Sequence, residues 1–437
     1  MSSNRPGAAL VAVALLVVAA CNPTPSTAPG SPSPSLGSGP SVAPPASAPA
    51  SPAATEDASA VYSLIRDQVE AIRGLEPTSD VEPVTIDETR LLENLEAEID
   101  AEQTPEQLAI SEDILATLGL IPEGSSLREL TLELLAGQVV GYYSPDRDEL
   151  YVVSKSGGTV GPVERATYAH EFTHQLQDQN FDLGSLDTTS IDQSDRALAQ
   201  LALIEGDASL AQFEWLFQHL TPAELGEVFA ASEDPEAQAA LDNAPAYLRD
   251  TAVFPYLSGL LFVQQLGTPG DYGAVDAAFA DPPESTEQVL HPEKYADREP
   301  PIEVRIGEGL AGQVGGGWSE AARDTLGELI LRTWLDEHGV GIPTTEPLPA
   351  PSEESARATA GWGGDRLVLL RHDDGALAIA MSTTWDTDAD AAEFATAAET
   401  ALADPGFEGE LFHRAGTRDV LIAIGDDAAA VLAALRG

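Results

Sequence analysis

Two histidines and a glutamate near the middle of the chain have the spacing of a metal site. His170 and His174 lie four residues apart in a segment, from about Val163 to Gln179, whose pattern favours a helix. Four residues complete one turn plus about 40°, so both imidazoles face the same side and can reach a single cation. Glu171 lies on the flank of that face, close enough to take a proton from water without itself binding the metal.

Composition makes this pattern informative. The chain has only seven histidines and one cysteine, so any metal must be held by imidazole and carboxylate groups. The alternative is that both imidazoles are ordinary core side chains satisfied by hydrogen bonds. The presence of Glu171 favours a catalytic metal site, because a purely structural metal site does not need a carboxylate at that position.

A third ligand is expected, because catalytic zinc sites usually have three protein ligands and one open position. The candidate is Glu205, which lies among apolar residues on the next helix, around Ala197 to Phe217. A carboxylate in such a setting is costly unless it meets a cation, which is either a metal or an arginine. Gly206 beside it would let another backbone approach closely. Asp207 could orient an imidazole, although ordinary helix polarity explains it equally well.

The two motifs together, HEFTH at residues 170–174 and LIEGDA at 203–208, resemble the gluzincin branch of the zincin metallopeptidases. The resemblance implies Zn2+ held by His170, His174 and Glu205, with Glu171 as general base. It also implies a helix-rich core with a small β-sheet beside the active-site helix. We expect strands at 138–143 and 149–153, which precede that helix as the sheet does in zincins. By analogy, an edge strand there could bind an extended peptide.

Two residues are candidates for the hydrogen-bond donor that stabilises an oxyanion in such a reaction. Tyr256 lies in FPYLSGLLFV (254–263), where Pro255 suits a helix start and Gly259 leaves room for close packing. The stretch resembles the Tyr-x-x-Gly helix of aminopeptidase-like gluzincins; an amphipathic tyrosine at a core edge is the alternative. His291, in the polar loop 285–295, is the second candidate, and an ordinary surface loop is its alternative. That loop, with GYY at 141–143, resembles a family of uncharacterised bacterial lipoproteins that carry the same zincin motif.

The N-terminus is typical of an exported protein. Arg5 precedes an apolar run from Ala8 to Ala20, which is too short to span a bilayer comfortably but suits a signal peptide. The sequence VAAC at 18–21 resembles the lipobox of bacterial lipoproteins, although Val18 stands where leucine is commoner. The resemblance implies cleavage before Cys21 and a diacylglycerol on its sulfur; a plain secretory signal is the alternative. We therefore expect an extracytoplasmic lipoprotein anchored to the membrane through Cys21.

The charge of the chain argues against nucleic-acid binding. Seventy-two acidic residues face 21 basic ones, giving a formal net charge of −51 that repels phosphate backbones. The partners expected instead are a peptide or protein substrate and, through the lipid anchor, a membrane.

The composition divides the chain into a signal peptide (1–20), a disordered tether rich in Pro, Ser and Ala (21–57), a zincin-like metallohydrolase domain (58–342), a proline-rich linker (343–355) and a small α+β domain (356–437). Helix-start signals at Thr104, Ser126 and Thr221 make the larger domain mainly helical. The predicted fold class is α+β and mainly helical: a zincin-like core with a small β-sheet, plus a small C-terminal α+β unit.

The function expected from these features is zinc-dependent hydrolysis, with peptide bonds as the first substrate class. An endopeptidase is slightly favoured over an aminopeptidase, because no separate acidic motif that would bind the amine of a substrate is evident. One alternative is a non-enzymatic envelope lipoprotein, a binding or scaffold module with a structural or vestigial zinc site. Hydrolysis of a non-peptide amide in the envelope is compatible with the same residues.

Overall fold

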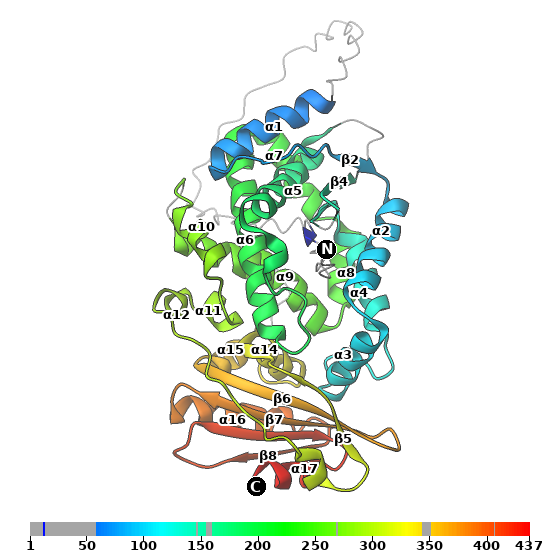
Figure 1. Ribbon diagram of the computed structural model, residues 1–437, viewed down its shortest axis with the longest axis vertical. Helices are drawn as coiled ribbons and strands as arrows, with labels where there is room; N and C mark the ends of the chain where they lie inside the picture. Colours follow the sequence, from blue (N-terminus) through cyan, green and yellow to red (C-terminus); the bar gives the residue numbers. More distant parts are fainter. Residues whose placement is uncertain are drawn as a thin grey trace, which may run out of the picture.

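The computed structural model describes residues 12–13, 58–145, 147–153, 160–267, 270–342, 351–405 and 407–437. The fold is α+β and mainly helical, as predicted. A large helical part carries a small mixed sheet, and a five-stranded antiparallel sheet lies at the other end of the molecule (Figure 1). Within these residues no helix is both long and apolar enough to cross a membrane. Cys21, the tether and all but two residues of the predicted signal peptide lie outside the described ranges.

Short helices and a small sheet precede the helix that carries the two motif histidines. They are β1 (Ala12–Val13), α1 (Ala58–Arg73), β2 (Val84–Ile86), α2 (Glu88–Glu102), α3 (Pro105–Thr117), α4 (Leu127–Gln138), β3 (Gly141–Ser144) and β4 (Glu149–Val153). Strands β3 and β4 form the predicted antiparallel hairpin. Strand β2 joins β4 in parallel and β1 joins β3 in antiparallel, giving the order β1-β3-β4-β2.

Local capping residues set several helix starts where the sequence places them. The hydroxyl groups of Thr104, Ser126 and Thr221 each accept a hydrogen bond from the amide three residues ahead. Thr104 and Thr221 complete the reciprocal capping box with Gln107 and Glu224. These three predicted helix starts are confirmed.

Long helices form the centre of the molecule (Figure 1). In chain order this part contains α5 (Pro162–Phe181), the 3-10 turn η1 (Leu183–Ser185), α6 (Ser194–His219), α7 (Pro222–Ser232), α8 (Pro235–Asn243) and α9 (Ala246–Leu266). Helix α5 packs against β3 and β4 on one side and against α6 on another, and α6 also packs along α9. This arrangement buries α5 within the core, so its polar residues need partners inside the protein.

Two glycines allow α6 and α9 to pack backbone against backbone. A Cβ atom on Gly206 would lie 2.3 Å from the carbonyl of Gly259, and one on Gly259 would lie 2.2 Å from the carbonyl oxygen of Ala202. Neither position can accept a larger side chain without separating the helices. The close approach predicted for Gly206 and Gly259 is confirmed, and it fixes α6, which carries Glu205, against α9, which carries Tyr256.

The expected helix start at Pro255 is wrong. Helix α9 begins one residue after Pro245 and continues through Pro255, which lies in its interior. Since proline has no amide hydrogen, the carbonyl of Thr251 loses its helical partner at this point. Thr251 and Pro255 both line the cavity described below. Tight packing against α6 therefore outweighs the local preference of proline for a first turn.

The C-terminal half adds short helices and the second sheet. Its elements are α10 (Gly273–Ala280), α11 (Thr286–Leu290), α12 (Pro292–Ala296), α13 (Leu310–Val314), β5 (Trp318–Asp324), α14 (Gly327–Glu337), α15 (Glu353–Thr359), β6 (Trp362–His372), β7 (Leu377–Trp385), α16 (Asp388–Ala401), β8 (Gly409–His413), β9 (Asp419–Gly425) and α17 (Ala428–Leu435). The strand order is β5-β6-β7-β9-β8, and every neighbouring pair is antiparallel.

The predicted start of the C-terminal unit at residue 356 is too late. Strand β5 pairs with β6 from Trp318 opposite His372 to Asp324 opposite Leu367, across the proline-rich segment that was expected to be a linker. Helix α14 contributes Trp334 to the same hydrophobic cluster as Leu367. The unit therefore begins at β5, because strand pairing joins residues on either side of the segment.

The C-terminal unit also holds the start of α6. The carboxylate of Asp324, at the end of β5, accepts hydrogen bonds from the amide of Ser194 at 3.0 Å and from its hydroxyl at 2.7 Å. The amide of Asp195 donates to the carbonyl of Thr325 at 3.1 Å. These bonds provide partners for backbone amides at the helix start, so the second sheet is coupled to the helix that carries Glu205.

The glycine contact generates a stability prediction. We expect Gly259→Ala to lower the free energy of unfolding by about 1–3 kcal/mol, because the new methyl group would meet backbone rather than a movable side chain. Gly226→Ala is the matched control: Gly226 lies in exposed α7 with open space around its Cβ position, and alanine there should add up to about 1 kcal/mol. Urea unfolding of both variants tests this, and a Gly259→Ala protein as stable as wild type would contradict the packing account.

Candidate metal centre

Helix α5 places the motif residues deep inside the protein. It begins at Pro162 and ends at Phe181, and Asp182 caps it in the left-handed conformation. Every residue from Ala166 to Gln177 is buried. His170 and His174 project toward α6, where they meet Glu205, and Glu171 approaches Gly141 of β3. The helix thus presents different polar groups to the two elements that enclose it.

The structure brings the three predicted ligands together. The Nε2 atom of His170 lies 3.3 Å from an Oε2 oxygen of Glu205 and 3.1 Å from Nε2 of His174, which is itself 3.4 Å from the same oxygen. All three side chains are at most 1% exposed. Within the described residues this is the one group of three or more ionisable side chains found with the geometry to hold a metal ion.

The electrostatics of the three groups are those of a site that exchanges protons for a cation. Burial lowers the pKa of His174, but the Glu205 carboxylate outweighs this effect and raises that pKa to about 9. Burial lowers the pKa of His170, and His174 beside it lowers that pKa further. Burial raises the pKa of Glu205, but the imidazoles, above all His174, hold it below its usual value. A metal ion would displace the proton of His174 and pair with the same carboxylate.

The sequence left open that Glu205 pairs with an arginine, and the structure does not show that pairing. The buried arginine of this region, Arg73 at the end of α1, donates from Nε to Asp207 at 2.8 and 3.1 Å. Gln177 lies between this pair and the site, because its Oε1 is 2.8 Å from Nδ1 of His174 and its Nε2 is 2.8 Å from Asp207. Asp207 therefore acts on an imidazole through Gln177 and not directly.

Sequence reasoning missed both Gln177 and Arg73. Gln177 follows His174 by three residues on the same helix face, a spacing that could have drawn attention to it. Arg73 is 134 residues from Asp207, and no local pattern connects them.

Glu171 is the residue of the motif that does not take part in the cluster of three predicted ligands. Its side chain is 0% exposed, and both carboxylate oxygens lack a hydrogen bond of good geometry. Burial raises the pKa of this carboxyl well above its ordinary value, and Glu205 raises it further, while His174 and the backbone amide of Tyr143 act in the opposite direction. A buried carboxyl group with free oxygens is costly to keep, so its position beside the three ligands needs a chemical reason.

Tyr256 also lies beside the three ligands. Its ring stacks on that of His170, with 6.1 Å between ring centroids and 27° between ring planes. Tyr256 and Glu205 border a cavity of about 300 Å³ whose other walls come from α2, α3, α4, α6 and α9. The cavity therefore opens onto the predicted site from the side of Glu205, and the helices between residues 88 and 138 cover it.

His291, the other candidate donor, pairs with Glu328 and has no hydrogen bond or ion pair with the three predicted ligands. It is the residue between α11 and α12, and its Nε2 atom lies 3.0 Å from the buried carboxylate of Glu328 on α14. The hydrogen bond that His291 donates to this carboxylate is the main cause of its raised pKa. An ion pair that joins α11 to α14 explains the residue, and it is not among the side chains that line the cavity.

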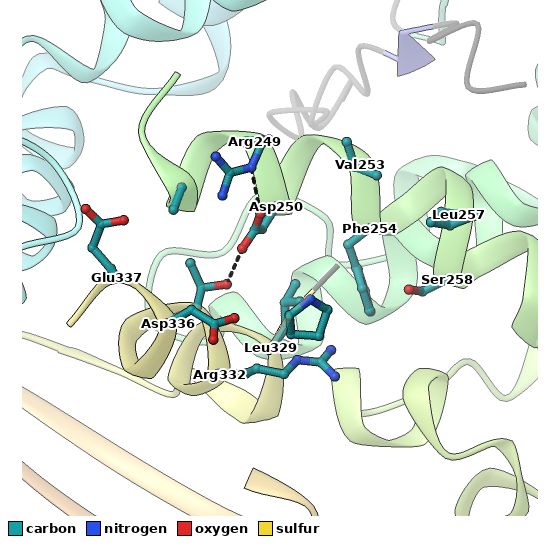
Figure 2. Close-up of a pocket in the computed structure, with 13 residues that line it drawn as sticks. Arg249, Asp250, Val253, Phe254, Leu257, Ser258, Leu329, Arg332, Asp336 and Glu337 are labelled. Carbon is teal, nitrogen blue, oxygen red and sulfur yellow. Dashed lines mark hydrogen bonds and ion pairs between the residues drawn. The ribbon is translucent and has the colours of Figure 1, made fainter. Parts of the chain in front are cut away.

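A second pocket occupies another face of α9. It lies between α9 and α14, has a volume of about 110 Å³ and includes Arg249, Asp250 and Arg332 in its lining. Figure 2 shows Arg249 directed at Asp250, which also accepts a hydrogen bond from Thr333 at 2.8 Å. The residues of α9 that line this pocket differ from those that line the cavity beside Tyr256. The pocket is therefore separate from the candidate metal centre.

Comparison with known proteins places only the C-terminal unit. Residues 313–435 match the model of a domain of unknown function, DUF8575. The match begins just before β5 and ends in α17, which agrees with the extent of the unit in the structure. No curated protein and no solved structure matches the chain.

The geometry predicts that Glu205 is necessary for metal binding. We expect Glu205→Gln to weaken zinc binding at least tenfold, because the amide lacks the charge that offsets a divalent cation between two neutral imidazoles. Glu214→Gln is the control, since it makes the same change on the same helix but lines a different groove. Competition with a fluorescent chelator measures both affinities. Equal affinity of Glu205→Gln and wild type would rule out Glu205 as a ligand.

Proposed function

We propose that this protein is a zinc-dependent hydrolase that cleaves peptide bonds outside the cytoplasmic membrane. In this proposal His170, His174 and Glu205 hold Zn2+, Glu171 is the general base and Tyr256 supports the developing oxyanion. The observation that carries the proposal is the buried, unpaired carboxylate of Glu171 directly beside three groups spaced to hold a metal ion.

The spacing of the three ligand atoms supports zinc. Nitrogen and oxygen ligands lie about 2.0–2.1 Å from a tetrahedral zinc ion, so two ligands of one ion are about 3.4 Å apart. The three separations among His170, His174 and Glu205 are 3.1, 3.3 and 3.4 Å. A tetrahedral ion bound to these atoms would keep a fourth position open, which favours a catalytic site over a structural one.

The state of Glu171 supports its role as a base. When bound, zinc supplies a Lewis acid that polarises the scissile carbonyl and promotes the ionisation of water. Glu171 would accept the proton of the attacking water on one of its free oxygens and later deliver it to the leaving amine. Burial and the charge of Glu205, which raise the pKa of Glu171, also increase its affinity for that proton.

In this proposal Tyr256, which stacks on His170, would assist the reaction. Its hydroxyl group is a potential donor to an oxyanion, and the stacking against His170 together with the α6–α9 glycine contact restricts its position.

An extended peptide is the substrate class that the surroundings favour. Strand β3 lies beside Glu171, and its outer edge pairs with the apolar residues Ala12 and Val13. Cleavage before Cys21 would remove those two residues and leave the edge of β3 available to another extended segment. Leu95, Leu135 and Leu201 line the cavity beside Glu205, so we expect apolar side chains next to the cleaved bond.

The location outside the membrane rests on the N-terminal sequence. The apolar run that ends in Cys21 suits a lipoprotein signal, and the tether up to residue 57 would connect the anchor to α1. A peptidase held in this way acts on proteins near the membrane surface.

The first prediction from this proposal concerns Glu171. We expect Glu171→Gln to bind one zinc ion as wild type does and to cleave peptides about 100 to 10,000 times more slowly, because the amide cannot accept a proton. Zinc content and cleavage of casein or a peptide library, measured on both proteins in detergent, test this.

The other outcomes of the same experiment separate the alternatives. Zinc bound by both proteins with no cleavage by either would contradict the peptidase proposal and favour a scaffold role or another amide substrate. Equal cleavage by both proteins would eliminate Glu171 as the base.

A second prediction concerns Tyr256. We expect Tyr256→Phe to lower kcat about 100 to 1,000 times without changing zinc affinity, since the ring that stacks on His170 remains and only the donor is lost. Tyr247→Phe, which removes a hydroxyl from the same cavity wall, is the control and should retain the wild-type kcat. Steady-state kinetics with the best library peptide test this. An unchanged kcat in Tyr256→Phe would show that Tyr256 is a packing residue and not a hydrogen-bond donor.

A further inference from the structure

The imidazole of His174 is held by a chain of buried polar groups that extends away from the candidate metal centre. Its Nδ1 atom lies 2.8 Å from Oε1 of Gln177. The amide nitrogen of Gln177 donates to Asp207 at 2.8 Å and to the carbonyl of Ile204 at 3.0 Å. Because both of those partners are acceptors, the amide oxygen of Gln177 must be the atom that faces His174.

This orientation determines the tautomer of His174. An amide oxygen can only accept, so Nδ1 of His174 must carry the proton. The lone pair of a neutral His174 is then on Nε2, the atom that faces His170 and Glu205. Gln177 therefore selects the one neutral form of His174 that can bind a metal at this position.

Asp207 fixes Gln177 and is itself fixed by Arg73. The carboxylate of Asp207 is 0% exposed and receives Nε of Arg73 on both oxygens, at 2.8 and 3.1 Å. A buried carboxylate is expensive without a cation, and losing one partner of such a pair costs more than losing both. The position of the Gln177 amide thus depends on a charge supplied by α1.

Contacts on several sides restrict the position of the Arg73 side chain. It is 1% exposed, the one lysine or arginine among the buried residues of the described chain. Its Nη1 atom pairs with Asp276 of α10 at 2.6 Å, and its guanidinium lies 4.5 Å from the ring centroid of Tyr272 and 5.8 Å from that of Phe181. These contacts on several sides restrict the planar guanidinium more than they would a lysine ammonium.

We propose that Arg73, through Asp207 and Gln177, is a positioning residue of the metal centre that sets the tautomer of His174 and thereby the affinity for metal. Helix α1, the first described element after the predicted tether, then contributes to the candidate metal centre. The inference rests on the proposed metal site but not on any particular substrate.

The test is a double-mutant cycle on zinc affinity in the full-length chain, purified in detergent. Zinc dissociation constants are measured by chelator competition for wild type, Arg73→Met, Asp207→Asn, the double variant Arg73→Met/Asp207→Asn and Gln177→Leu. The thermal midpoint of each metal-free protein is measured in parallel. Arg66→Met is the matched control, because Arg66 is also on α1 but pairs with Asp80 and Glu82, outside the chain of contacts.

We expect Gln177→Leu and each single variant of the ion pair to weaken zinc binding 10–100-fold. The double variant should bind zinc no more weakly than Asp207→Asn alone, because the two residues act along one path. Arg66→Met should keep the wild-type affinity even if its thermal midpoint falls. If Arg73→Met fails to fold, the double variant and Gln177→Leu still test the inference. Neither of them leaves a buried charge unpaired, so both are expected to fold.

Two results would overturn the inference. One is a zinc affinity of Arg73→Met or Gln177→Leu within twofold of wild type while the metal-free midpoint falls, which would make the network purely structural. The other is wild-type protein that binds no zinc. Wild-type protein that binds zinc and cleaves no peptide would contradict the proposed function alone, and the cycle would still support the positioning role.

Discussion

The burial of α5 on all sides is the constraint on which the rest of the structure depends. A helix enclosed by β3, β4 and α6 must satisfy every polar side chain internally, and α5 carries two imidazoles and a carboxylate within one and a half turns. Glu205 meets the imidazoles, Gln177 meets His174, and Asp207 with Arg73 completes the set. Both carboxylate oxygens of Glu171 are left without a hydrogen bond of good geometry, as are the Tyr168 hydroxyl, Nδ1 of His170 and Oε1 of Gln175. The two free oxygens of Glu171, directly beside the three predicted ligands, are the basis of its proposed catalytic role.

Other parts of the fold keep this arrangement from relaxing. The glycine contact holds α6 against α9, so Glu205 and Tyr256 are fixed relative to each other. The C-terminal sheet holds the start of α6 through Asp324, and α1 holds its middle through Arg73. The unit that matches the domain of unknown function is thus coupled to the helix of the third ligand. Through these contacts the unit helps to position Glu205 in the candidate metal centre.

The sequence predicted what depends on neighbours along the chain. The capping residues Thr104 and Thr221, the β3–β4 hairpin and the histidine spacing are local, and the structure has them as expected. Glu205 could be predicted as a ligand because an acidic residue on an apolar helix face needs a cation. Arg73 was not, because its partner is 134 residues away. Strand β5 was missed for the same reason, since its pairing with β6 crosses the proline-rich segment. Local preference misled at Pro255, which lies inside helix α9 and not at its start.

Anomalous diffraction at the zinc absorption edge, from crystals of the protein grown with zinc, tests the central claim most directly. The account predicts one strong peak within about 2.0–2.2 Å of Nε2 of His170, Nε2 of His174 and a carboxylate oxygen of Glu205, with a fourth position not occupied by the protein. A zinc-soaked crystal with no peak at these three residues, or with the ion fully enclosed by four protein ligands, would contradict it.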